Sequence, residues 1–248
     1  MGKVFLIASG KGGVGKTTVC SNVAAALAEK HKVLVLDADL DLSNLDIAFG
    51  LRNRHVYDLQ DLYYRNATFE DAAVSVPGHP NLTALFAPLY REVSVELLLR
   101  FLKSLIEEKK REYDYIFVDC PAGRGKTLEV LSDPRYRYLI VTTPDRTAIS
   151  DGERTADYLF SRGCERVRLV VNRVRPSLIK KNHAPDIDDI IDTTAIRLIG
   201  LIPEDVSVIR AGNTDTLAYD LPKSRSRTAF GNIALRLTGV YRDLDKFN

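Results

Sequence analysis

The chain has few cysteines and no long apolar run, and both absences narrow the classes of protein to which it can belong. Cys20, Cys120 and Cys164 are odd in number and far apart, and they form no C-x-x-C pair. Neither a disulfide framework nor a zinc site is therefore indicated, and a reducing cytoplasm is the expected compartment. No apolar run approaches the ~20 residues that a membrane-spanning helix needs. The N-terminus enters an apolar strand pattern at once, so we expect no signal peptide.

A strong excess of charge is missing as well. The 35 Lys and Arg residues nearly balance the 33 Asp and Glu residues, which leaves a formal net charge of +2. Net charge alone therefore predicts no strong attraction to nucleic acid or anionic lipid. Internal repeats, low-complexity segments and linkers are also absent, so we expect residues 1–248, 45% of which are hydrophobic, to form one domain.

Short apolar runs alternate with helical patterns along nearly the whole chain. The runs are continuous, as in strands buried on both faces. Clear helical patterns cover Val93–Lys110 and Asp145–Phe160, whereas Ser177–Thr194 is predicted as a loop with a short helix. The alternation predicts an α/β fold with a mostly parallel sheet covered by helices on both faces. The predicted strands are Val4–Ala8, Val33–Leu36, Leu82–Phe86, Tyr115–Val118, Leu139–Thr142, Val167–Val171 and Ile196–Ile202.

A glycine-rich stretch follows the first apolar run and opens into an Ala-rich helical segment. It reads Gly10-Lys11-Gly12-Gly13-Val14-Gly15-Lys16-Thr17-Thr18 and matches G-x-x-x-x-G-K-[ST]. A loop around a triphosphate must turn several backbone N–H groups inward, and glycine adopts such conformations at low cost. The following helix adds free N–H groups and the positive end of its dipole. We predict that these nine residues bind phosphate, with Lys16 on the outer phosphates and the Thr17 hydroxyl on Mg²⁺.

The string KGGVGKTT resembles the deviant Walker A motif of the MinD/ParA family of ATPases. In that family the early lysine, here Lys11, crosses a dimer interface to the partner's nucleotide. The resemblance therefore implies a P-loop fold, ATP and Mg²⁺ as ligands, and catalytic roles for Lys11 and Lys16. It extends from Lys3 to about Tyr241, with four motif blocks in the family's order.

Acidic residues end the second predicted strand, in the segment Asp37-Ala38-Asp39-Leu40-Asp41. Asp37 and Asp39 are expected to share a face of the extended chain and to point into the ligand crevice, unless they merely solvate a strand end. One carboxylate there can hold a water for attack on the γ-phosphate, and another can reach the metal's water shell. Leu36–Gly50 resembles the family's first switch, which implies that Asp39 is the hydrolytic aspartate and that Asn44 lies near the partner subunit.

A second strand ends in an acid, at Tyr113–Asp119. This pattern is typical of a Walker B element, in which the carboxylate, here Asp119, holds Mg²⁺ through water. The next four residues, Cys120-Pro121-Ala122-Gly123, resemble the family's second switch, which implies that the Gly123 N–H senses the γ-phosphate. Arg124 and Lys126 depart from the family pattern, and we expect them to be solvated, the alternative being contact with phosphate or a partner's acid.

Two later segments are candidates for the base pocket. After Asn172, arginines stand at positions 173 and 175, where the guanine motif N-K-x-D has lysine and aspartate, and arginine cannot accept the guanine hydrogens. This favours adenine. The resemblance implies that Asn172 contacts it, although asparagine at a strand end can also form a turn. Gly200–Ala211 resembles the family's I-P-E-D segment, which implies that Pro203 and Asp205 line the pocket.

The resemblance is closest to the MinD branch. It implies an ATPase switch in which ATP drives homodimerisation and slow Mg²⁺-dependent hydrolysis reverses it, positioning a division or other apparatus together with an activating or cargo protein. The alternative is a ParA-like partitioning ATPase whose dimer binds DNA nonspecifically, for which Lys223–Arg227 and scattered arginines are the available cations. Relatives that mature metal centres need paired cysteines, which Cys120 and Cys164 do not supply, and no substrate signature of a ligase is present.

The end of the chain departs most from the MinD branch, whose members append an amphipathic membrane helix. Only Asp245–Asn248 would remain beyond the last docked helix, and one phenylalanine buries too little area for stable attachment. We therefore expect no autonomous membrane binding and, if any recruitment, recruitment through a partner. Helical spacing predicts that one docked stripe contains Phe230, Ile233, Ala234, Leu237, Val240, Tyr241 and Leu244.

Overall fold

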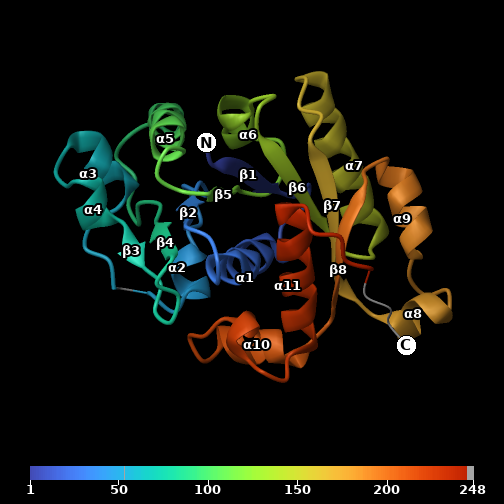
Figure 1. Cartoon of the computed structure of the whole chain (residues 1–248). Helices are drawn as coiled ribbons and strands as arrows, with labels where there is room; N and C mark the ends of the chain where they lie inside the picture. Colours follow the sequence, from blue (N-terminus) through green and yellow to red (C-terminus); the bar gives the residue numbers. More distant parts are fainter. Residues whose placement is uncertain (53, 245–248) are drawn as a thin grey trace.

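A sheet of eight strands runs through the computed structural model, which describes residues 1–52 and 54–244 (Figure 1). The strand order is β3-β4-β2-β5-β1-β6-β7-β8, and every neighbouring pair is parallel except β3 and β4. The predicted α/β fold is thus confirmed. The strands are β1 (Lys3–Ala8), β2 (Val33–Asp37), β3 (Val74–Ser75), β4 (Leu82–Leu85), β5 (Tyr115–Asp119), β6 (Arg137–Thr142), β7 (Val167–Val174) and β8 (Leu198–Pro203).

Helices cover both faces of the sheet. Two of them, α1 and α11, cross the face turned to the reader in Figure 1, and α5, α6 and α7 pack on the other. The helices are α1 (Lys16–Ala28), α2 (Leu45–Ala48), α3 (Leu59–Tyr64), α4 (Phe69–Ala72), α5 (Val95–Lys109), α6 (Lys126–Leu131), α7 (Arg146–Ser161), α8 (Pro176–Lys180), α9 (Ile187–Thr194), α10 (Val206–Gly212), the 3₁₀ turn η1 (Ala218–Asp220) and α11 (Arg225–Thr238).

The central strand β1 explains why the apolar runs are continuous. Val4 and Leu6 pack into the core layer under α5 and α7, whereas Phe5 and Ile7 pack into the layer under α1 and α11. Alternate side chains of a strand point to opposite faces, so a strand with helices on both sides needs an apolar residue at every position. Each fully buried large side chain stabilises the fold by about 1.5–3 kcal/mol.

The chain order around β1 creates the ligand crevice. From β1 the chain moves to β2, which lies beyond β5, and it later crosses to β6 on the opposite side of β1. Ligands of such sheets bind outside the carboxyl ends of the strands at this reversal. The register pairs Asp119 at the end of β5 with Ile7 of β1 and with Asp37 of β2. Two acidic strand ends therefore flank the loop that leaves β1.

The last helix is shorter than its sequence pattern predicts. Ser224 caps α11 by accepting a hydrogen bond from the Arg227 N–H at 3.2 Å, and Gly239 ends it with a left-handed φ of 98°. Phe230, Ile233, Ala234 and Leu237 are buried as predicted, but Val240, Tyr241 and Leu244 are exposed. The predicted docking of these three is wrong because the backbone turns at Gly239 and the helical spacing stops there. Asp245–Asn248 lie outside the described residues.

Two smaller expectations also change. Ser177–Thr194 was expected to hold one short helix, but the structure has α8 and α9 on either side of Pro185. Asp186 explains the second, because its carboxylate caps α9 by accepting from the Asp189 N–H at 2.7 Å. The antiparallel edge strand β3 was not predicted. Among the helices of residues 1–52 and 54–244, none combines the length and the apolar character that crossing a bilayer requires.

Candidate nucleotide-binding site

The predicted phosphate loop connects the end of β1 to the start of α1. Its last glycine, Gly15, has a φ of 91°, and a Cβ at that position would lie 2.3 Å from the Asn172 amide nitrogen. Glycine is therefore required both by the backbone conformation and by the close approach of Asn172. No described side chain caps α1 at Gly15. The first N–H groups of α1 and the positive end of its dipole thus face the loop, as an anion site requires.

The second half of the loop is anchored by Asn172. This side chain is buried, and its amide donates a hydrogen bond to the Val14 carbonyl at 2.8 Å. The register between β7 and β8 is irregular from Val171 to Val174, the segment that contains Asn172, and Arg173 has a φ of 55°. The sequence predicts an adenine contact for Asn172 but gives no sign of this bond to the loop, because it joins residues 158 positions apart.

Thr17 and Asp119 meet where the metal was predicted. The Thr17 hydroxyl donates to Asp119 Oδ2 at 2.5 Å, and Asp119 Oδ1 is a buried atom with no hydrogen-bond partner among the described residues. Burial raises the pKa of Asp119 to about 6, against the lowering effects of the Thr17 hydrogen bond and the Lys16 charge. An unpartnered carboxylate oxygen beside a hydroxyl suits an oxygen-seeking cation such as Mg²⁺. These two residues therefore fit the predicted metal.

The first switch segment begins with two aspartates in different surroundings. Asp37 is buried and accepts from the Ser43 hydroxyl at 2.6 Å and from the Asp39 N–H at 3.0 Å. Burial, and then the charge of Asp119, raise the pKa of Asp37 to about 8. β2 ends at Asp37, although the Ala38 N–H still donates to the Asp119 carbonyl at 2.9 Å. Asp39 is partly exposed, and its carboxylate accepts from the Leu42 N–H at 3.1 Å.

The segment that resembles the second switch is hydrogen-bonded to Ser9, the residue that precedes the phosphate loop. The Gly123 N–H, predicted as a γ-phosphate sensor, donates to the Ser9 carbonyl at 2.8 Å. Lys126 is exposed, as expected, and its ammonium lies 3.3 Å from the carboxylates of Glu96 and Glu129. Its charge is thus balanced within its own chain. Arg124 is exposed, as expected.

Lys11 makes its contacts outside the loop. Its ammonium donates to the Thr147 hydroxyl at 2.7 Å and lies 3.6 Å from the Asp145 carboxylate. The same carboxylate caps α7 through the Ala148 N–H at 3.0 Å. The side chains of Lys11 and Asp145 are about half exposed, at 48% and 55%. The Lys11 side chain therefore contacts the start of α7 and remains accessible to solvent.

The predicted base-pocket residues surround one cavity. Its volume is about 230 Å³, and it begins beside the first turn of α1. Asp205 has a second task, because it accepts from the Ser207 and Ser226 N–H groups at 2.9 and 3.0 Å and so joins α10 to α11. Burial opposes ionisation of Asp205, but these hydrogen bonds and those from neighbouring serines prevail and hold its pKa well below the usual range. The cavity is lined by Thr18, Asn172, Arg173, Pro203, Glu204, Asp205, Val208 and Ile209.

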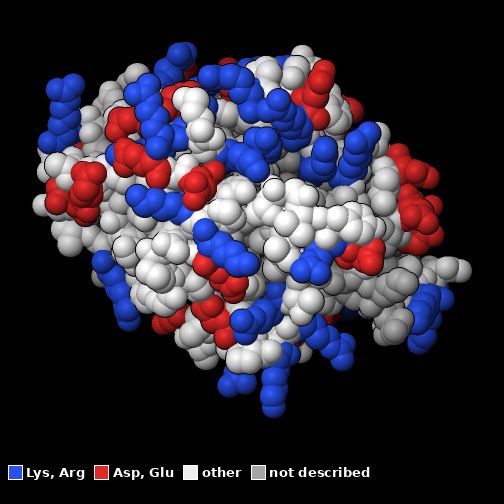
Figure 2. All heavy atoms as spheres, viewed as in Figure 1, with Lys and Arg blue, Asp and Glu red and all other residues white. Residues whose placement is uncertain are grey.

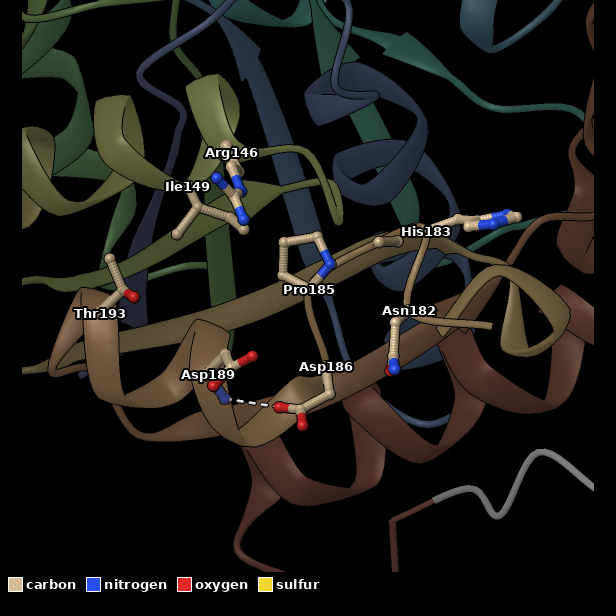
Figure 3. A pocket seen from close by; sticks show the side chains of 9 residues that line it. Arg146, Ile149, Asn182, His183, Pro185, Asp186, Asp189 and Thr193 are labelled. Atoms are coloured by element: carbon tan, nitrogen blue, oxygen red, sulfur yellow. Dashed lines mark hydrogen bonds between the residues drawn. The ribbon is translucent and has the colours of Figure 1, made fainter. Parts of the chain in front are cut away.

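A larger cavity of about 530 Å³ lies between α7 and the α8–α9 segment (Figure 3). Arg146 and Ile149 of α7 face Pro185 across it, while Asp186 and Asp189 mark its α9 side. No phosphate-loop residue lines this cavity. The cavity adjoins the two residues that Lys11 contacts, because Arg146, which lines the cavity, lies between Asp145 and Thr147 in the sequence.

A glycine loop between a central strand and a helix, flanked by two acidic strand ends, defines a P-loop nucleotide-binding protein. The model of the CobQ/CobB/MinD/ParA nucleotide-binding domain matches residues 5–218. The chain belongs to this family, and it is an ATPase.

MinD proteins are among those to which the chain is similar. The chain is 37% identical to septum site-determining protein MinD of Synechocystis sp. over 241 residues, which cover 96% of this chain and 90% of the relative. It matches the MinC:MinD cell division complex of Aquifex aeolicus with a TM-score of 0.90 at 33% identity, covering 99% of both chains. It also matches MinD of Pyrococcus horikoshii complexed with Mg-ADP, with a TM-score of 0.83 at 28% identity and 96% coverage of both chains. The predicted resemblance is confirmed.

Proposed function

We propose that this ATPase is a dimerisation switch of the MinD kind. ATP binding brings two copies together, slow Mg²⁺-dependent hydrolysis separates them, and the cycle positions the cell division apparatus. The position of Lys11 carries this proposal. A lysine that served its own nucleotide would be held inside the loop, but Lys11 is half exposed and rests on Thr147 and Asp145. The Lys11 side chain can therefore exchange these contacts for contacts with a second copy of the protein, and the loop backbone need not move.

ATP is the proposed nucleotide of the loop from Gly10 to Thr18. The uncapped start of α1 and Lys16 would hold the β- and γ-phosphates, and the cavity at Asn172 and Pro203 would hold adenine. Thr17 and Asp119 are the proposed Mg²⁺ residues. Mg²⁺ bound there would neutralise charge on the outer phosphates.

Hydrolysis is assigned to the two switch segments. Asp39 is the proposed residue that positions the attacking water, since the charge of Lys16 acts on its carboxylate, whose other partners are the backbone N–H groups of Asp41 and Leu42 in the same turn. The Gly123 N–H would exchange the Ser9 carbonyl for the γ-phosphate. Both changes replace only a few backbone hydrogen bonds, so the proposed second switch state requires little rearrangement of the chain.

A partner protein is part of the proposal, because the solved relative from Aquifex aeolicus is a complex of MinC with MinD. We infer a cytoplasmic, one-domain protein that acts with such a partner. The alternative, a ParA-like dimer on DNA, loses support at Lys223–Arg227. Lys223 and Arg225 are exposed, but Arg227 is partly buried and lies over the Tyr219 ring at 5.3 Å, so the cluster offers DNA only two exposed cations.

The proposed absence of autonomous membrane binding has weaker support than the sequence suggested. The expectation requires that the apolar residues before Asp245 pack against the sheet, but Val240, Tyr241 and Leu244 are exposed. Sedimentation with anionic vesicles, in ATP and in ADP, decides the question. ATP-dependent co-sedimentation of the pure protein would overturn the proposed absence.

The replacement Asp39→Ala tests the switch. Loss of the water-positioning carboxylate should slow phosphate release by about a hundredfold or more, while the ATP-bound dimer persists longer. Phosphate release and light scattering after ATP addition measure both effects. Asp41→Ala is the matched control, because Asp41 belongs to the same segment but pairs with Arg91 at 3.1 Å. Unchanged turnover in Asp39→Ala would remove Asp39 from the mechanism.

A further inference from the structure

Four arginines line one cavity at the end of the sheet that faces away from the nucleotide loop. The cavity has a volume of about 310 Å³ and lies between the last turn of α11 and the starts of β6, β7 and β8. Its floor includes the buried apolar side chains of Phe5 and Leu237. The arginines are Arg137, Arg166, Arg168 and Arg236.

The fold brings these arginines together from distant parts of the sequence. Arg137 begins β6, and its guanidinium lies 5.8 Å from the centre of the Phe5 ring on the α11 face. Arg168 belongs to the start of β7, where its neighbour Leu169 packs toward the opposite face. Arg166 precedes β7 by one residue, and Arg236 comes from α11. Two strand ends thus present three guanidinium groups to one opening, whereas the Arg236 guanidinium donates to the carbonyls of Ile199, Arg242 and Asp243.

Three of these arginines lack a matching acidic side chain among the described residues. Within residues 1–52 and 54–244, no carboxylate forms an ion pair with Arg137, Arg166 or Arg168. Arg166 donates to the Arg135 carbonyl at 3.3 Å, and Arg168 donates to the Val167 carbonyl at 2.8 Å. These contacts engage one nitrogen of each guanidinium and leave N–H donors over.

Like charges that lie close together in a recess repel one another, and the repulsion is stronger where water is partly excluded. Burial, followed by the charge of Arg166, lowers the pKa of Arg137. Elsewhere on the chain arginines meet acids, as Arg135 meets Asp133 at 2.7 Å. A bound anion would offset the repulsion in the cavity.

This cavity is separate from the ATP site. The phosphate loop follows the carboxyl end of β1, whereas the arginines stand at the amino ends of β6 and β7. Six residues of β6 place about 20 Å between the two ends of the sheet. Figure 2 shows Lys and Arg side chains gathered across the upper part of the view, which includes the end of the sheet where β6 and β7 begin in Figure 1.

We propose that the cavity is a second ligand site, which binds a compact phosphorylated anion such as a pyrophosphate or phosphate monoester group. Planar guanidinium groups bind phosphate oxygens bidentately, and several of them around one recess match the charge of such a group. The volume falls within the range of small-ligand sites. The opening is a recess between a helix and a sheet, which suits a small group better than the long surface of duplex DNA.

Equilibrium dialysis with radiolabelled pyrophosphate tests the site. The full chain is first saturated with Mg-ADP, so that the nucleotide loop is filled. We expect one further equivalent of pyrophosphate to bind, and to bind at least about tenfold more weakly in Arg166→Gln/Arg168→Gln. The single variant Arg166→Gln, at an exposed position, should weaken binding in the same direction. Arg111→Gln removes the same charge from an exposed residue outside the cavity and should bind as the wild type does.

Mg-ADP affinity, binding to vesicles and binding to duplex DNA are measured for the same variants. Mg-ADP affinity should be unchanged in all variants, so failure of this site and failure of the proposed ATP switch are distinguishable. Vesicles with phosphoinositide headgroups form a second arm, and arginine-dependent sedimentation there would assign the phosphate group to a lipid. The proposal is overturned if neither pyrophosphate nor these vesicles bind, if the double variant binds them as the control does, or if arginine-dependent binding is found with duplex DNA alone.

Discussion

The two lysines of the phosphate loop stand in different surroundings. Lys16 begins α1, between the buried Val14 that Asn172 holds and the Thr17 hydroxyl that bonds to Asp119. Lys11 is exposed, and its contacts lie outside the loop at the start of α7. The second half of the loop is thus fixed by hydrogen bonds to the buried residues Asn172 and Asp119. In the first half the Lys11 carbonyl accepts from the Ser9 hydroxyl at 2.8 Å, but the Lys11 side chain is held only by a surface contact. Nucleotide binding and the proposed switching are therefore assigned to different side chains within nine residues.

The difference is also one of free energy. Leaving a buried polar group without its hydrogen bond costs about 1–3 kcal/mol, whereas an exposed ion pair contributes about 0.2–1 kcal/mol. The fixed half therefore resists rearrangement, and the surface contact of Lys11 can be exchanged at little cost. The proposed exchange of Lys11 between partners in every ATPase cycle requires this second kind of contact.

The largest effect is expected from removing the lysine of the fixed half. Lys16→Ala should weaken ATP binding by about a hundredfold, because charge-assisted hydrogen bonds to the outer phosphates are lost. Lys11→Ala is the matched control and should keep most of the affinity. Titration with a fluorescent ATP analogue measures both. Equal losses in the two variants would end the distinction between the halves of the loop.

A smaller effect is expected from removing the anchor of the fixed half. Asn172→Ala should lower the free energy of unfolding by about 1–3 kcal/mol, because the buried Val14 carbonyl loses its donor. Chemical denaturation measures the change, and ATP affinity should fall with it because the loop is less well ordered. Asn213→Ala, at an exposed asparagine, serves as the control. An Asn172 variant as stable as this control would show that the loop is anchored elsewhere.

The smallest effect is expected from the surface contact. Asp145→Asn removes the charge near Lys11 while its side-chain oxygen can still cap α7. Freed from this pair, Lys11 should favour the ATP-bound dimer by about two- to fivefold at each site. Analytical ultracentrifugation across a range of protein concentrations measures the shift, with Asp157→Asn on the same helix as control. A weaker dimer in Asp145→Asn would mean that Asp145 supports the interface instead of restraining Lys11.

Much of the fold was predictable because its signals are local. Each predicted strand is present, since a sheet covered on both faces requires continuous apolar runs such as that of β1. An error arises where one residue changes the backbone direction within a regular sequence pattern. Gly239 ends α11 with a left-handed turn, so the spacing that includes Tyr241 and Leu244 continues in the sequence but not in the helix. A two-residue edge strand such as β3 is too short to form a pattern.

The contacts of the candidate site also fall into those that the sequence predicts and those that it does not. The Thr17–Asp119 contact was predictable, because each residue belongs to a motif whose place at a strand end is known. The anchoring of Val14 by Asn172 and the resting place of Lys11 were not, because they join residues 158 and 136 positions apart with no motif between them. Motifs therefore predict which residues form the proposed phosphate and metal sites, but not the contacts that fix or release the loop.

The most direct test of the switch is the mass of the protein in solution with each nucleotide. Multi-angle light scattering should show a monomer in Mg-ADP and a dimer in Mg-ATP for the wild type, with hydrolysis slowed by Asp39→Ala. Lys11→Ala should bind ATP yet remain a monomer, because its ammonium is proposed to act in the opposite site. A wild type that stays monomeric in Mg-ATP, or a Lys11→Ala variant that dimerises as the wild type does, would contradict the account.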